Sequence, residues 1–154
     1  MSFTRQPVIL RPGEGPVARI PGHPFVIKAS SEDTRGAYAL AEATLTGEGP
    51  PQHIHHAEEE AFYVLDGEVG IQVGDQIVSG TKGAFVLIPR GTVHTFWNAG
   101  PGPAKLLVIV SPPGIEEYLA EAIGDEDIDT ATFIARVSAV ADSYQMEVVG
   151  PPRG

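Results

Sequence analysis

Three of the five histidines of this chain lie within four residues, inside the segment Gly49–Val69, which reads GPPQHIHHAEEEAFYVLDGEV. If this segment is extended, His53 and His55 point to the same face, because side chains alternate along a β-strand. Their Cα atoms then lie about 6.6 Å apart, close enough for two imidazoles to bind one ion. Glu60 shares the parity of the apolar Phe62, and a cation would stabilise a buried carboxylate there. Taken alone, the segment fits half of a metal site or a solvated polar loop equally well.

A second segment, GAFVLIPRGTVHTFWNAG at residues 83–100, supplies a further candidate ligand. An apolar strand is followed by a turn at Pro89–Gly91, and His94 begins the returning strand. His94 shares its face with Phe96 and Asn98, so its imidazole is also expected to point inward. The chain has no cysteine, which excludes disulfides and thiolate ligands. The two segments together predict a metal site built from histidine and carboxylate donors.

The elements that position these residues are predicted to be short strands. The chain is rich in turn-forming residues, with 18 glycines and 14 prolines. Many short strands joined by turns, with no helix between them, favour an antiparallel sandwich or barrel. The expected strands are Val8–Leu10, Phe25–Ile27, Tyr38–Leu45, Phe62–Leu65, Val69–Val73, Ile77–Val78, Ala84–Ile88, Val93–Trp97 and Lys105–Val110.

The character of the sequence changes after residue 111. In PPGIEEYLAEAIG, apolar residues recur at helical spacing up to Gly124, and DTATFIARVSAVADSY predicts a second helix with Asp129 or Thr130 as its N-cap. We therefore predict one domain over residues 1–154, with a barrel core at about 24–111 and a helical tail at about 112–154. The apolar faces of these helices could cover the mouth of the barrel or pack on a second subunit.

Composition excludes several classes of function. The net charge of −10 disfavours nucleic acid and anionic membrane surfaces as partners, because both require a basic face. The longest apolar runs, AFVLI and LLVIV, are too short to span a bilayer. The first fifteen residues lack the apolar core of a signal peptide, so a cytoplasmic location is expected.

The two histidine-containing segments resemble the two conserved motifs of the cupin superfamily. The first motif is Gly, five residues, His-x-His, four residues, Glu, six residues and Gly, and it is matched by Gly47, His53, His55, Glu60 and Gly67. The second is Gly, five residues, Pro-x-Gly, two residues, His, three residues and Asn, and it is matched by Gly83, Pro89, Gly91, His94 and Asn98. Every position matches, and the motifs span a third of the chain.

The resemblance implies an all-β jelly-roll barrel, or double-stranded β-helix, with short C-terminal helices. It further implies that His53, His55, Glu60 and His94 bind one divalent ion. Nitrogen and oxygen ligands without sulfur suit Fe, Mn, Co, Ni, Cu or Zn, and four protein ligands leave one or two positions open for water, substrate or dioxygen. The neighbouring residues His56, Glu58 and Glu59 are expected to face solvent or to support the ligands.

Strand parity also suggests a substrate pocket around the metal. The residues expected to face inward are Phe62, Val64, Ile71, Val73, Phe85, Leu87 and Phe96. They either line an apolar cavity or simply fill the barrel, and a cavity of this kind would prefer a flat apolar ligand carrying one or two oxygens. Basic residues near the second motif, such as Arg90 and Lys105, are few, so a sugar phosphate is disfavoured.

The segments SPPGIEEYLAEAI and YQMEVVGPP resemble small single-domain cupins described as quercetin-dioxygenase-like. This resemblance implies an oxidoreductase in which a flavonol-like enolate binds the metal and Glu60 takes the hydroxyl proton as general base. Dioxygen would then cleave the ring with loss of carbon monoxide. It also implies a homodimer. Two alternatives use the same site, namely a metal-assisted cyclase or isomerase that needs no oxygen, and a non-catalytic small-molecule-binding protein.

Overall fold

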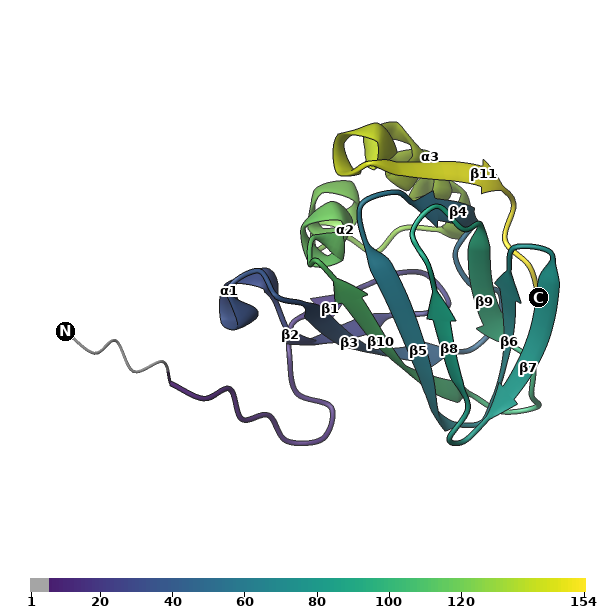
Figure 1. Cartoon of the computed structure of the whole chain (residues 1–154), viewed down its shortest axis with the longest axis horizontal. Coiled ribbons are helices and arrows are strands. Elements are labelled where there is room, and N and C mark those ends of the chain that lie inside the picture. Colours follow the sequence, from purple (N-terminus) through teal and green to yellow (C-terminus); the bar gives the residue numbers. More distant parts are fainter. Residues whose placement is uncertain (1–5) are drawn as a thin grey trace.

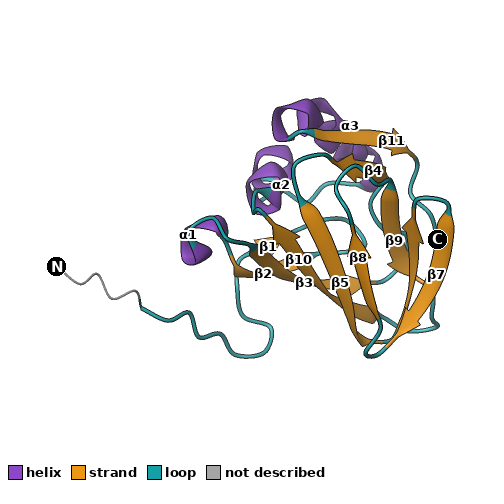
Figure 2. Cartoon of the chain, in the orientation of Figure 1, coloured by secondary structure: helices purple, strands orange, loops and turns teal. Residues whose placement is uncertain are grey.

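Figure 1 shows a computed structural model of the chain, in which residues 6–154 are described. Two antiparallel sheets make up most of it, with the C-terminal helices at one end (Figure 2). The larger sheet has the strand order β1-β2-β3-β10-β5-β8 and the smaller sheet the order β11-β4-β9-β6-β7. The larger sheet consists of β1 (Val17–Ala18), β2 (Phe25–Ala29), β3 (Ala39–Leu45), β10 (Ala104–Ser111), β5 (Glu59–Asp66) and β8 (Phe85–Ile88). The smaller consists of β11 (Met146–Gly150), β4 (Gln52–His55), β9 (His94–Asn98), β6 (Glu68–Val73) and β7 (Gln76–Thr81).

The inner faces of the two sheets form the core. Along β3, the sequence ALAEATL alternates buried and half-buried positions, and β10 does the same beside it. The sheets meet where Phe62 of β5 packs edge-on against Phe96 of β9, with ring centroids 5.0 Å apart. Burying one such ring contributes about 1.5–3 kcal/mol. The alternation that predicted strands therefore also separates core from surface.

Most of the expected strands are confirmed, but some elements near the N-terminus differ. Val8–Leu10 forms no strand, and its three apolar side chains are exposed with no neighbouring strand to pair them. The strand β1, which pairs with β2, extends the larger sheet upstream of residue 24. A single helical turn, α1 (Ser31–Thr34), separates β2 from β3 where no helix was expected, and Ser30 and Asp33 form a capping box at its start.

The C-terminal region contains both predicted helices, α2 (Ile115–Ile123) and α3 (Thr130–Val140), followed by the short 3-10 helix η1 (Ala141–Tyr144). The side chain of Asp129 accepts a hydrogen bond from the backbone N–H of Thr132 at 2.8 Å, which confirms it as the N-cap of α3. The two helices are joined through the hydroxyl of Tyr118, which donates to the Val137 carbonyl at 2.9 Å.

The chain does not finish as a helical tail, which corrects the expectation for residues 112–154. Residues Met146–Gly150 form β11, which pairs antiparallel with β4 and places Met146 opposite His55 and Val148 opposite His53. The sequence MEVVG is short and lies after a helical run, so its strand character depends on a partner distant in sequence. Within residues 6–154, the helices are all too short to cross a bilayer.

Candidate metal centre

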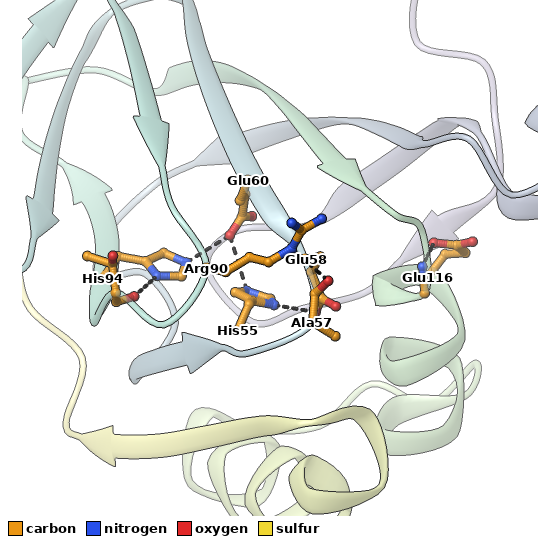
Figure 3. A network of polar contacts seen from close by, with 9 residues as sticks. His55, Ala57, Glu58, Glu60, Arg90, His94 and Glu116 are labelled. Carbon is orange, nitrogen blue, oxygen red and sulfur yellow. Dashed lines mark hydrogen bonds and ion pairs between the residues drawn. The ribbon is translucent and has the colours of Figure 1, made fainter.

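Three strands from the two sheets bring the four predicted ligands together. His53 and His55 lie on β4, Glu60 on β5 and His94 on β9, and the register places His53 directly opposite His94. All four side chains are buried, and one potential ligand atom from each lies within 4.8 Å of the others. Figure 3 shows Glu60 pointing toward both His55 and His94. Residues far apart in sequence therefore form one cluster with the composition of a metal site.

Each histidine ring is oriented by a hydrogen bond at Nδ1. His53 Nδ1 is 2.6 Å from the Pro51 carbonyl, and His94 Nδ1 is 2.9 Å from the Thr92 carbonyl. His55 Nδ1 is 2.6 Å from Oε1 of Glu58. Because all three acceptors are oxygens, the hydrogen bonds assign the proton to Nδ1 and leave the three Nε2 atoms to face one another. Metal-binding histidines are held in the same way by partners behind them.

The remaining polar atoms of the cluster fit a cation. Oε2 of Glu60 lies 2.8 Å from His94 Nε2 and 3.2 Å from His55 Nε2. The second contact lacks hydrogen-bond geometry, so the buried Nε2 of His55 has no hydrogen-bond partner. Buried polar atoms are nearly always paired in native proteins. An orphaned nitrogen beside a carboxylate oxygen and two further imidazoles is therefore consistent with an ion bound between them.

The electrostatics of the cluster are dominated by burial and by Glu60. Burial lowers the pKa of His53 well below its usual value, and repulsion from His94 and His55 adds to the effect. Burial would also lower the pKa of His55, but the Glu60 charge and the hydrogen bond that Nδ1–H donates to Glu58 raise it to about 9. Burial opposes ionisation of Glu60, yet the His55 charge holds its pKa far below normal. Metal binding at neutral pH should therefore release a proton from His55.

The turn at Pro89–Gly91 connects the two motifs physically. Gly91 has φ of 78°, a conformation that side chains other than glycine rarely adopt. In this conformation its N–H donates to the carbonyl of His55 at 2.8 Å. Arg90 adds a hydrogen bond from Nε to the Ala57 carbonyl at 3.0 Å (Figure 3). The predicted turn thus positions the strand that carries two ligands as well as the strand that carries His94.

An apolar cavity lies against the cluster, and both His53 and Glu60 form part of its wall. Its volume is about 450 Å³ when its open mouth is included, but its interior is narrow. The other lining residues are Ile20, His23, Phe25, Pro50, Pro51, Phe96, Ile115, Tyr118, Leu119, Phe133, Val137, Met146 and Val148. The C-terminal helices therefore cover the cavity, which agrees with the first of the two roles considered for them.

Of the residues predicted to form the substrate pocket, some are buried in the core without lining the cavity. Phe96 lines the cavity, whereas Phe62, Val64 and Ile71 are buried elsewhere in the core and Val73 packs against it half-buried. They fill the barrel rather than form the pocket.

The assignment of Phe85 and Leu87 to the pocket is wrong. They are 60% and 52% exposed. Their strand pairs Val86 with Phe62 and Ile88 with Glu60, so these partners face inward and the two larger residues face outward.

Sequence reasoning missed most of the cavity wall. His23 lines it and is almost fully buried, and it could have been noticed because only His23 and His56 lie outside the ligand set. Two residues beside the ligands, His56 and Glu58, were expected to face solvent or to support the ligands, and they do so. His56 is exposed and contacts Glu147, and Glu58 supports His55 from behind.

The Glu58 contact leads to a testable prediction. Replacing Glu58 by glutamine should weaken metal affinity about 10–100-fold, because His55 exchanges a charged acceptor, which raises its basicity, for a neutral amide oxygen. The comparison is Glu147→Gln, which alters an exposed carboxylate 2.9 Å from His56 and should leave affinity unchanged. Competition with a chromophoric chelator measures both values. Equal affinities for the two variants would contradict a supporting role for Glu58.

Comparison with known proteins places the chain in a family. Residues 43–110 match the family described as Cupin domain. An uncharacterized protein of Streptomyces coelicolor is 32% identical over 78 residues, which cover 51% of this chain and 69% of that protein. Quercetin 2,3-dioxygenase of Bacillus subtilis is 27% identical over 124 residues, which cover 77% of this chain but only 35% of that enzyme.

The fold comparison agrees with the sequence comparison. The crystal structure of TT1209 from Thermus thermophilus is 25% identical and superposes with a TM-score of 0.55, over 61% of this chain and 88% of that one. The region that matches the family, residues 43–110, contains the strands that carry all four clustered side chains. With its two antiparallel sheets and both histidine motifs, the chain belongs to the cupin family.

Proposed function

We propose that this chain is a metal-dependent dioxygenase that binds one divalent transition-metal ion through His53, His55, Glu60 and His94. The observation that carries the proposal is the convergence of three Nε2 atoms and one carboxylate oxygen in a buried site that opens on an apolar cavity. When bound, such an ion supplies a Lewis acid with one or two coordination positions left over. The similarity to quercetin 2,3-dioxygenase supports a flat aromatic enolate as the substrate class.

Glu60 is the residue proposed for proton transfer. Its carboxylate lies in the cavity wall, where a substrate hydroxyl can come within hydrogen-bond reach. It accepts the hydroxyl proton at a carboxylate oxygen and so leaves the substrate as an electron-rich enolate. The apolar walls exclude water from that anion, and their narrow spacing favours a small ring over a three-ring flavonol.

Elemental analysis and oxygen uptake test the proposed function. Protein purified without a chelating tag should contain about one metal ion per chain, or acquire it on loading with Fe, Mn, Co, Ni, Cu or Zn. One redox-active form should then consume oxygen with small aromatic enolates or flavonols. Bound metal without oxygen uptake would instead support a metal-assisted cyclase, an isomerase or a small-molecule-binding protein. Absence of metal after every loading would contradict the proposal.

We further propose that the chain forms a homodimer, as the resemblance to small cupins implies. Light scattering at micromolar concentration should then give a mass near twice the 16.3 kDa of one chain. A mass of one chain over the same concentration range would contradict the dimer without affecting the metal site.

A further inference from the structure

His23 is the polar residue in the cavity wall that the metal centre does not use. Only 2% of its surface is exposed, and its ring lies edge-on to Phe25, Phe96 and Phe133, with centroids 5.8–6.2 Å away. The Pro21 carbonyl is nearby, but Nδ1 lacks hydrogen-bond geometry to it and has no partner. The ring is thus held rigidly by aromatic packing while its hydrogen-bonding capacity remains unused.

The other polar residues of the wall are already occupied. The Tyr118 hydroxyl donates to the Val137 carbonyl, and His53 and Glu60 belong to the metal centre. Burial lowers the pKa of His23 to about 3, against a weaker opposing effect of the Pro21 carbonyl, so the ring is neutral at physiological pH. A neutral imidazole offers one donor and one acceptor. A buried group of this kind is costly unless something pairs with it.

We propose that His23 is a substrate-binding residue, and that the cavity takes a small flat aromatic molecule with a hydroxyl or carbonyl oxygen that hydrogen-bonds the His23 imidazole. This proposal rests on the proposed function, in which a second oxygen of the same aromatic ligand faces the metal centre. The apolar walls contact the faces of the aromatic ring, and His23 hydrogen-bonds one oxygen substituent. Sites built to hydrogen-bond an oxygen reject analogues that lack it.

Phenol and toluene are suitable probes because they have nearly the same shape and differ in one hydroxyl. Both are titrated by calorimetry into zinc-loaded protein, first wild type and then His23→Leu, which keeps the apolar bulk and removes both nitrogens. The ratio of the phenol Kd to the toluene Kd should rise about tenfold in His23→Leu, since phenol loses one hydrogen bond and toluene loses none. His23→Gln, which retains an amide donor and acceptor, should recover part of the loss.

Leu119→Met is the matched control, because it alters the same wall without altering its polarity, does not remove any of the rings that pack on His23, and should leave the ratio unchanged. In wild type labelled with ¹⁵N, phenol but not toluene should shift the ring nitrogen resonances of His23, which also decides the question if His23→Leu does not fold. An unchanged ratio in His23→Leu, unshifted nitrogens, or failure of both probes to bind wild type would overturn the proposal.

The zinc content separates this result from the proposed function. If the protein takes up no zinc, the metal-dependent function fails, and the same titrations on the metal-free chain still test His23. If zinc binds and the phenol-to-toluene ratio is unaffected by His23→Leu, the metal site stands and the role of His23 falls.

Discussion

Glu60→Gln is expected to abolish turnover and to reduce metal binding sharply. The Glu60 side chain is 2% exposed and its Oε2 lies 2.8 Å from His94 Nε2 and 3.2 Å from His55 Nε2. Glutamine has nearly the same shape but carries no charge, so the ion loses its one anionic ligand and the substrate loses its base. Loss of a general base alone lowers turnover about 10²–10⁴-fold.

The neighbouring Glu59→Gln provides the control for this experiment. Glu59 is exposed and contacts Arg90 at 3.4 Å, so its replacement should change neither metal content nor turnover. Metal content by elemental analysis and oxygen uptake are measured on both variants. If Glu60→Gln binds metal normally and turns over at the wild-type rate, Glu60 is not the base. If it binds metal normally but is inactive, Glu60 acts on the proton without being needed for the ion.

Phe96→Ala is expected to lower the free energy of unfolding by about 3–5 kcal/mol. The ring is 2% exposed, packs against Phe62 and His23, and forms part of the cavity wall. Its removal leaves a void between the two sheets that neighbouring side chains can only partly fill. Urea unfolding of the metal-free protein measures the loss without a contribution from the ion.

Phe85→Ala makes the matched comparison, because it removes the same side chain from the outer face of β8. Phe85 is 60% exposed, so the cost should stay within about 0.5 kcal/mol. Similar losses for the two variants would show that Phe85 is buried in solution, as strand parity first suggested.

The metal cluster could be predicted from sequence in two steps, with the two histidines of β4 paired by local geometry and the complete set of four ligands implied by the resemblance to the two cupin motifs. His53 and His55 alternate with Ile54, so their shared face follows from strand geometry alone. Parity worked there because polar and apolar residues alternate. In FVLI of β8 every residue is apolar, and the pattern cannot say which face is buried. Pairing with Phe62 and Glu60 of β5 decides it, and this pairing is a tertiary fact.

The cavity could not be predicted for a related reason. Its wall is assembled from residues near His23, from α2 and α3, and from β11, all distant in sequence from the two motifs. Helical periodicity located α2 and α3 well, but it does not say what an apolar helix face packs against. His23 had no neighbouring motif to mark it, and its interest comes entirely from burial and the lack of a partner.

The pairing of β11 with β4 also affects the order in which the site is synthesised and folded. The strand that carries His53 and His55 lies between β9 and β11, so one of its edges remains unpaired until Met146–Gly150 is in place. A ribosome releases the chain from its N-terminus onward. The four clustered side chains therefore leave the ribosome before the last strand that flanks them, and β4 gains its second neighbouring strand only once synthesis has passed residue 150. Metal binding to the complete site would then occur late, after both histidine-containing motifs have been translated.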